Sequence, residues 1–463
     1  MKELNQYHIN YFINQLENKN LEIHNIVLLQ NGKTILSKGY YPYNPDELNT
    51  IYSCTKSFIS LAIGILYDRG LIDLKAKLLD YLKQYEYLRD YPSSNITIAE
   101  LLTMQLGHDK QPYIPFGQDW VEVILKKPLS WPNGDHFHYY NLSSYLLSVV
   151  IETITHTSTF HFIKENILNP LEISQCYFDQ DNKNRNIGGW GMHLSCNDLA
   201  KFGQLLLQKG YYNGKQIVSE KWIEMATHKQ IDTIPFYSKS ESVNGYGYQF
   251  WMSTHNSYRA SGLFGQLCLV NPENQLVLAV TSAAGSSQPI LDSLFDVIDN
   301  DRSSTFQSEF RIKEIAKGTE NKELIDIINH KELICQKNSS FEKIEFNIED
   351  DLINIYLTKD NHKYLFASKA GKWHKFDSDF IELSKLSWAL TGNDKTEGYI
   401  PSINYGCHGW INDTTLQFSY RNSDLPARYS ITVDFDYQYL TLTYSVSECE
   451  SNFTSGKAIV KYR

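Results

Sequence analysis

An apolar stretch headed by a serine and a lysine constrains this chain more than any other part of the sequence. Between residues 58 and 66, apolar side chains fall on nearly every side of a helix, and Gly70 follows as a stop. A helix that is apolar all round is buried, so we expect this segment at the centre of the fold. Ser53 and Lys56 stand three positions apart at its head, and on a helix such a pair shares one face.

The pairing of a hydroxyl with a buried amine has a defined chemistry. A neutral lysine amine can take the proton of a serine, and burial lowers the lysine pKa toward neutrality. Ser53 and Lys56 are therefore a candidate nucleophile and base. The same spacing recurs at Ser340 and Lys343, but there it adjoins alternating, strand-like sequence with no buried helix behind it, and we interpret it as chance.

Length and composition set wider limits. The chain has 463 residues, for which two domains are the ordinary expectation, and its 42% apolar and 21% charged residues are typical of a globular protein. A net charge of −10 argues against nucleic acid or an anionic membrane as a partner. The N-terminal residues carry no apolar signal-peptide core, and no apolar window is long enough to span a membrane, which predicts a cytoplasmic protein.

The residues that most often bind metals are arranged without a metal-binding pattern. The seven cysteines are odd in number and scattered, and no C-x-x-C pair occurs. This argues against a disulfide framework and against a structural zinc site. The histidines also lack a metal spacing such as H-E-x-x-H, so we expect neither a metal nor a cofactor.

The first 300 residues alternate between helical and strand-like patterns. Capping pairs, turn residues and apolar periodicity mark the elements. In chain order we expect a helix over 3–18, a hairpin over 23–37 that turns at Asn31-Gly32, a helix that starts near Thr97, a helix over 142–154, a helix from Ser195 to Leu207, and strands over 246–251 and 267–282.

The character of the sequence changes around residue 300. Residues 311–336 are charged and favour helix, and from residue 342 onward short alternating segments are separated by polar turns. We therefore predict a first domain over 1–305, a helical linker over 306–340, and an antiparallel β-rich domain over 341–463.

A second candidate element lies well downstream of Ser53. Tyr139 and Asn141 follow a turn at residues 131–135 and precede the apolar helix over 142–154. The phenol of Tyr139 could shuttle a proton, and the Asn141 amide could bind Lys56 or a substrate. A Tyr-x-Asn spacing is common, so a purely structural Tyr139 stays open on the sequence alone.

Seven stretches occur together in one order: residues 52–58, 68–73, 96–104, 137–141, 169–171, 198–203 and 262–266. In this combination the chain resembles the serine β-lactamase and penicillin-binding-protein superfamily over roughly residues 20–300. The nearer resemblance is to its esterase-like branch, whose relatives include class C β-lactamases, D-amino-acid peptidases and nylon-oligomer hydrolases.

This resemblance implies an α/β (α+β) β-lactamase/transpeptidase-like fold, with an antiparallel sheet flanked by helices, an all-helical region, and here a C-terminal antiparallel β-barrel or sandwich. It makes residues 1–305 a β-lactamase-like serine hydrolase domain, and residues 341–463 resemble the lipocalin-like or sandwich domains appended to some relatives. It also implies that Ser53 is the acylated nucleophile and Lys56 its amine partner, while Tyr139 and Asn141 form the family's Tyr-x-Asn element. The oxyanion hole would then be the backbone N–H groups of Ser53 and Leu263.

The third family element departs from its usual form. Normally Lys-Thr-Gly or His-x-Gly on a strand beside the site, it falls on Ala260-Ser261-Gly262, which lacks the cation unless Arg259 compensates. That cation usually helps to hold a substrate carboxylate, so its loss weakens the β-lactamase interpretation. Trp190 lies in a loop that would face the site in this family, where substrate contact and plain packing are both open. Since no separate deacylating Glu stands out, water activation would fall to Tyr139 and Lys56.

The expected function is a serine hydrolase that cleaves an ester or amide through a Ser53 acyl-enzyme, with Lys56 and Tyr139 as general base and acid. A D-aminopeptidase, or a D,D-peptidase with weak β-lactamase activity, is an alternative. The alternative of another class is a non-catalytic, penicillin-binding-like ligand sensor or scaffold. The expected partner is a small ester, amide or short peptide, with no nucleic acid and no membrane, and the oligomeric state stays open.

Overall fold

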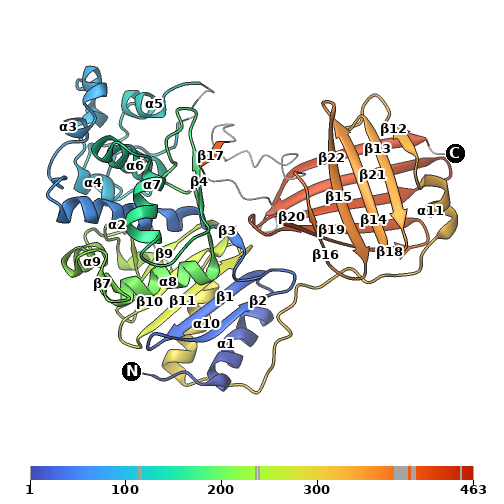
Figure 1. Ribbon diagram of the computed structural model, residues 1–463, viewed down its shortest axis with the longest axis horizontal. Helices are drawn as coiled ribbons and strands as arrows, with labels where there is room; N and C mark the ends of the chain where they lie inside the picture. The colour runs from blue at the N-terminus through green and yellow to red at the C-terminus, as the bar shows by residue number, and fades with distance from the viewer. Residues whose placement is uncertain are drawn as a thin grey trace. The chain divides into compact units, whose positions relative to one another are not determined.

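Two compact units make up the chain (Figure 1). The computed structural model describes residues 2–112, 114, 117–234, 237, 240–379, 395–397, 403–448 and 451–461, so part of the expected β-rich domain lies outside the described residues. The first unit comprises residues 1–39, 44–309 and 390–399, and the second comprises residues 40–43, 310–389 and 400–463. Among the described residues, none of the helices has the length and apolar character needed to cross a membrane.

An antiparallel sheet forms the base of the first unit. Its strands run in the order β2 (Lys33–Gly39), β1 (Ile23–Gln30), β11 (Leu276–Ser282), β10 (Leu267–Asn271), β9 (Tyr258–Ser261) and β8 (Trp251–Met252). The expected hairpin forms at Asn31-Gly32, where both residues adopt the positive φ that such a turn needs.

Helices cover this sheet, and its central strands β1, β10 and β11 are buried along their whole length. The helix α8 (Cys196–Leu207) starts at the expected cap, where Ser195 Oγ accepts the Asp198 N–H, and its apolar side packs on the sheet. The terminal helices α1 (Gln6–Asn18) and α10 (Gln288–Asn300) lie side by side (Figure 1), and Tyr11 Oη donates to Asp296 between them.

The central helix of the first unit is α2 (Thr55–Asp68), which lies between the sheet and a helical region (Figure 1). Its residues from Thr55 to Leu66 are all buried, as the all-round apolar pattern predicted. The helical region consists of α3 (Leu78–Tyr81), η2 (Lys83–Leu88), η3 (Pro92–Asn95), α4 (Ile98–Leu102), α5 (Trp120–Lys126), α6 (Asn141–Thr155), α7 (Thr159–Ile163) and η4 (Lys164–Leu168).

Smaller elements complete the first unit. A second sheet has the strand order β17 (Lys395–Glu397), β4 (Tyr177–Gln180), β5 (Met192–Ser195) and β3 (Leu48–Thr50). Its strand β3 directly precedes η1 and α2 in the chain. The remaining elements are η1 (Tyr52–Cys54), β6 (Tyr211–Tyr212), β7 (Lys215–Gln216), α9 (Glu220–Ala226), η5 (Glu241–Asn244) and η6 (Leu263–Gly265).

The second unit is a nearly closed, barrel-like sheet. Its strands follow the order β12 (Glu332–Ile334), β13 (Lys343–Glu349), β14 (Leu352–Lys359), β15 (His362–Ala370), β18 (Ile403–Asn412), β19 (Thr415–Asn422), β20 (Arg428–Phe435), β21 (Tyr439–Glu448) and β22 (Ser451–Lys461), with β16 (His374–Asp377) on β18. Neighbours pair antiparallel except for a short parallel contact of β15 with β18. The expected fold class is therefore confirmed, with the barrel form of its second part.

Alternation of side chains builds the interior of this sheet. In β14, Ile353, Ile355 and Leu357 are buried and the residues between them are more exposed. The gap between the first and last strands is bridged by backbone hydrogen bonds, from Gln336 N–H to Ile459 O at 2.9 Å and from Ser340 N–H to Lys457 O at 2.8 Å. The second Ser-x-x-Lys copy thus begins in the segment that links the first and last strands, and its Lys343 opens β13 instead of lying in a helix.

The prediction of a helical stretch over 311–336 is mostly wrong. Within it only α11 (Lys322–Ile328) is helical, and residues 313–320 have no regular structure. The reason is packing: Ile312 and Ile315 contact the cluster of Trp373, Tyr405 and Cys407 on the barrel, and Trp410 N–H donates to Lys317 O. Tertiary contacts in an extended conformation outweigh the local helix preference.

A short segment from the start of the chain belongs to the second unit. Tyr41 N–H donates to Phe310 O and Ile312 N–H donates to Tyr41 O, both at 2.7 Å. The Tyr41 hydroxyl reaches Trp373 O at 3.3 Å, and the Tyr43 ring lies 6.4 Å from the Tyr405 ring. Residues 40–43 are therefore part of the barrel's surroundings, although they precede α2 in the sequence.

Candidate active site

Ser53 lies where a sharp backbone turn meets the start of α2. The residue before it, Tyr52, has φ +45°, a left-handed conformation that costs a bulky residue about 1–2 kcal/mol. Packing holds it there, since Tyr52 is 6% exposed and its ring lies edge-on to Phe264 with centroids 5.5 Å apart. The turn places Ser53 just before the positive end of the α2 dipole, where negative charge is favoured.

The Lys56 amine is the centre of the site. Its Nζ lies 2.8 Å from Ser53 Oγ and 2.8 Å from Asn141 Oδ1, and it also donates to the Gly189 carbonyl oxygen. The side chain is 1% exposed, and this burial holds the pKa of Lys56 well below its ordinary value of 10.5. A neutral amine has two N–H groups and one lone pair. With both N–H groups given to the carbonyl oxygens of Asn141 and Gly189, the lone pair is left for the Ser53 hydroxyl proton.

Tyr139 lies beside the same pair. Its ring centroid is 5.0 Å from Lys56 Nζ, which itself lies 2.8 Å from Ser53 Oγ. Burial raises the pKa of Tyr139 well above 10.0, and the influence of the Ser53 side chain only partly opposes this rise. The phenol therefore keeps its proton at neutral pH. Tyr139 and Asn141 reach the site together because α6 begins at Asn141.

The edge of β9 forms the other side of the site. A Cβ placed on Gly262 would lie 2.4 Å from Ile51 O and 3.3 Å from Ser53 N, so only glycine allows this close approach. Leu263 follows and is 43% exposed. Ser261 Oγ lies 3.3 Å from Ser287 Oγ.

Arg259 does not replace the missing cation. Its guanidinium donates to Met252 O at 2.8 Å and to Ser242 Oγ at 3.1 Å, and it also donates to Ser253 Oγ. Arg259 is 2% exposed and lies over the Trp251 ring, and burial lowers its pKa to about 10. The guanidinium is thus hydrogen-bonded to residues of β8, η5 and the segment after β8, and it is not available to bind a substrate carboxylate.

The loop before β5 contributes a partner of Lys56 that sequence reasoning missed. Gly189 provides the carbonyl acceptor, and a Cβ on Gly189 would lie 2.7 Å from Asn141 O. The glycine pair at 188 and 189 was the available signal, because adjacent glycines mark a close backbone approach. Trp190 is half-buried and stacks on Trp120 at 6.2 Å, which favours packing as its role.

Aromatic side chains gather around Trp251, beside Tyr139. Trp251 stacks on Tyr139 with centroids 5.4 Å apart, and Tyr246, Phe137 and Tyr237 each lie 4.9–5.6 Å from Trp251. The sequence indicated a strand over 246–251, but the strand β8 begins only at Trp251. Across the residues that the structure describes, no group of three or more His, Cys, Asp or Glu side chains could hold a metal.

Known proteins share this sequence and fold in part. Protein flp of Staphylococcus aureus (strain MW2) is 26% identical over 179 residues, covering 34% of this chain and 35% of that protein, so the match spans about a third of the relative's length. The 6-aminohexanoate-dimer hydrolase of Paenarthrobacter ureafaciens is 20% identical over 284 residues, 55% of this chain and 71% of that protein. The octameric penicillin-binding protein homologue from Pyrococcus abyssi shares the fold, with a TM-score of 0.52, 16% identity and coverage of 98% and 99% of the two chains.

The family assignment rests on a longer match. Residues 19–299, more than half of the chain, fit the family described as Beta-lactamase, and this range contains every candidate site residue named above. Together with the shared fold, this match shows that the chain belongs to the Beta-lactamase family.

Proposed function

We propose that this protein is a serine hydrolase that cleaves an ester or amide bond through an acyl-enzyme on Ser53. The observation that carries the proposal is the set of contacts of Lys56 Nζ, which meets the Ser53 hydroxyl at 2.8 Å while two carbonyl oxygens accept its N–H groups. This arrangement suits a neutral amine acting as general base.

In the acylation step, Ser53 Oγ attacks the substrate carbonyl carbon and its proton passes to the Lys56 amine. The backbone N–H groups of Ser53 and Leu263 stabilise the oxyanion. Tyr139 donates its proton to the leaving oxygen or nitrogen as that bond breaks, and the Lys56 ammonium returns a proton to the phenolate. The high pKa of Tyr139 supports its role as a proton donor that does not remain ionised.

Deacylation follows the same route with water as the nucleophile. Tyr139 and Lys56 take one proton from the water as its oxygen attacks the ester carbonyl of the acyl-enzyme. The bond between the carbonyl carbon and Ser53 Oγ breaks, and Oγ regains a proton from the same pair. The free acid leaves and the amine is neutral again, so the cycle closes without a further reactant.

The substrate class follows from the walls of the site. The position at which the resemblance implies a cation holds Ala260, and Arg259 is bonded elsewhere, so β9 offers a substrate carboxylate no cationic partner. The aromatic side chains around Trp251 suit an uncharged, apolar or aromatic group. The Paenarthrobacter relative is named a 6-aminohexanoate-dimer hydrolase, and an amide joins the two halves of such a dimer. This supports an amide, as well as an ester, as the substrate of this protein.

The test compares the two Ser-x-x-Lys serines. Ser53→Ala is expected to lower turnover of p-nitrophenyl butyrate on the order of 10³-fold or more, as loss of a nucleophile does. Ser340→Ala, in the second unit, is the matched control and should keep full turnover. Mass spectrometry after a fluorophosphonate probe should locate the adduct on Ser53. Unchanged turnover in Ser53→Ala would sink the proposal, and a folded protein with neither turnover nor labelling would favour a non-catalytic binder.

A further inference from the structure

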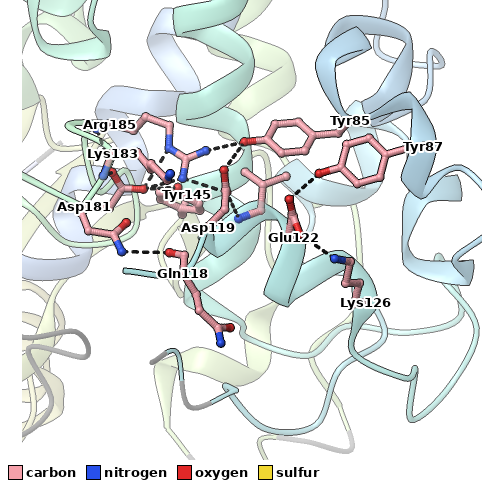
Figure 2. A network of polar contacts seen from close by, with 12 residues as sticks. Tyr85, Tyr87, Gln118, Asp119, Glu122, Lys126, Tyr145, Asp181, Lys183 and Arg185 are labelled. Atoms are coloured by element: carbon pink, nitrogen blue, oxygen red, sulfur yellow. Dashed lines mark hydrogen bonds and ion pairs between the residues drawn. The ribbon is translucent and has the colours of Figure 1, made fainter. Parts of the chain in front are cut away.

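A buried polar network joins the helical region to the loop that carries Gly189. Figure 2 shows Arg185 at its centre, with Asp181, Asp119 and Tyr85 around it. Arg185 Nε donates to Asp181 Oδ2 at 2.9 Å, Nη1 to Tyr85 Oη at 2.8 Å and Nη2 to Asp119 Oδ1 at 2.9 Å. The Tyr145 hydroxyl of α6 donates to Asp181 Oδ2 at 2.6 Å. The side chains of Arg185 and Asp181 are 12% and 0% exposed, so the charges are paired away from water.

The network is rigid at both of its ends. Asp119 caps α5 by accepting the Val121 N–H at 2.9 Å, and it also accepts the Tyr85 hydroxyl at 2.7 Å. Asp181 Oδ1 accepts the backbone N–H groups of Lys183 and Arg185 at 2.8 and 2.9 Å, which fixes the turn that presents the guanidinium. Through Arg185, the loop after β4 is therefore hydrogen-bonded to η2 and to the N-terminus of α5.

From Arg185 the loop continues to Gly189, whose carbonyl oxygen accepts a hydrogen bond from Lys56. The next residue, Asn186, accepts the Phe160 N–H on its side chain at 2.8 Å and the Ser148 hydroxyl on its carbonyl at 2.8 Å. Gly188 and Gly189 then press against the α6 backbone, and the Gly189 carbonyl accepts from Lys56 Nζ. Each residue between Arg185 and this carbonyl is thus in a short loop with little freedom to move.

We propose that Arg185 is a positioning residue for Lys56, which fixes the Gly189 carbonyl through the loop between them. The inference rests on the proposed function, because it assigns the network to the general base of that reaction. The Gly189 and Asn141 carbonyl oxygens together decide where the lone pair of the neutral amine points. A displacement of about 1 Å can cost a reaction roughly 100-fold when reacting groups depend on alignment.

The Tyr87–Glu122 pair beside the network provides the matched control. Tyr87, two residues from Tyr85 in η2, donates its hydroxyl to Glu122 of α5, as Tyr85 donates to Asp119 (Figure 2). The Glu122 carboxylate accepts from Lys126 Nζ at 2.5 Å on the surface, and among the described side chains neither Tyr87 nor Glu122 bonds to Arg185. Tyr87→Phe therefore removes the same chemical contact without loosening the Gly189 loop.

The experiment measures p-nitrophenyl butyrate kinetics and the rate of fluorophosphonate labelling for Arg185→Met, Tyr85→Phe and Tyr87→Phe, on protein shown to be folded by circular dichroism. Arg185→Met should lower kcat about 10- to 100-fold with KM within twofold, and should slow labelling of Ser53 by a similar factor. Tyr85→Phe should lower kcat about two- to fivefold by the same argument, and Tyr87→Phe should match the wild type.

A stability role alone would change melting temperature but leave kcat of the folded protein intact. The proposal is overturned if folded Arg185→Met keeps kcat within twofold of the wild type. If Arg185→Met does not fold, Tyr85→Phe decides, and wild-type kcat in that variant overturns it. Inactive Ser53→Ala beside a fully active Arg185→Met removes this inference alone, whereas an active Ser53→Ala removes the proposed function as well.

Discussion

Ala260 of β9 pairs with Cys268 of β10 and is 2% exposed, so a buried methyl group stands at the position where the resemblance to the superfamily implies a cation. The neighbouring Arg259 donates its hydrogen bonds to Met252 and Ser242 and leaves that position uncharged. The proposed nucleophile and base are both in place, while the position at which the resemblance implies a cation is uncharged, so the proposed reaction type and the choice of substrate can be tested separately.

We predict that added negative charge on the substrate brings no benefit. The pair to compare is p-nitrophenyl butyrate and mono-p-nitrophenyl succinate, which share the reacting carbonyl and differ by a distal carboxylate. The neutral ester should have the higher kcat/KM, because burial of an unpaired carboxylate costs free energy. Nitrocefin, which carries a carboxylate, should be a poor substrate. A higher kcat/KM for the succinate ester, or rapid nitrocefin turnover, would contradict the inference that β9 offers no cationic partner for a substrate carboxylate.

The pH dependence of kcat/KM should follow Lys56. Only the neutral amine can take the serine proton, so activity rises with pH as Lys56 loses its proton. Burial lowers the pKa of Lys56, which places the midpoint of this rise below 10.5. Burial raises the pKa of Tyr139 above 10.0, so ionisation of the phenol should not reduce activity until the pH exceeds that value. A rise centred at or above pH 10.5 would show that Lys56 is not the base.

Gly262→Ala should impair the enzyme through the close approach of β9 to the nucleophile. The new methyl would lie 2.4 Å from Ile51 O, so the strand must move away from Ser53 N. We expect kcat to fall on the order of 100-fold as the oxyanion site opens. Gly285→Ala is the control, since a Cβ there meets no heavy atom within 4 Å. Equal kcat values for the two variants would speak against the oxyanion site proposed here.

Glu152 should make the stability of the first unit depend on pH. Its Oε1 accepts the N–H groups of Thr159 and Asn186 at 3.3 and 3.1 Å, yet burial dominates and raises the pKa of Glu152 to about 7. The unfolded carboxyl titrates near 4.5, so stability from the protonated form is complete below that pH and is lost as the pH rises through 7.

Glu152→Gln keeps the oxygen acceptor without the charge. The wild type should lose on the order of 1–3 kcal/mol more than this variant between pH 5 and pH 8, by the value of about 1.4 kcal/mol for each pKa unit. Urea unfolding at both pH values measures the difference. Identical losses in the two proteins would mean that Glu152 does not titrate in this range.

Features that depend on local sequence could be predicted. The position of α2, the hairpin at Asn31-Gly32 and the caps of α4 and α8 follow from side-chain periodicity and from hydrogen bonds within four residues. The meeting of Ser53 with Lys56 is of this kind, because one helical turn joins them. Tyr139 and Asn141 needed the resemblance, since 85 positions separate Asn141 from Lys56.

Features made by distant segments could not be predicted. The Gly189 carbonyl reaches Lys56 across 133 positions, and a backbone carbonyl leaves no mark on residue identity beyond the glycines that permit its approach. The Arg185 network joins Tyr85 and Asp119 over gaps of 100 and 66 positions. The failure of the expected helix over 311–336 has the same origin, because barrel side chains that come later in the sequence decide its conformation.

The segment at residues 40–43 has a consequence for the order in which the protein is made. Tyr41 bonds to Trp373, 332 positions later, and Tyr40 and Tyr43 are only 5% and 4% exposed in the finished chain. During synthesis these tyrosines leave the ribosome long before Phe310 and Tyr405, whose rings lie 5.2 Å from Tyr40 and 6.4 Å from Tyr43. Residues 40–43, which are synthesised early, can therefore pack against the second unit only after its strands have been synthesised.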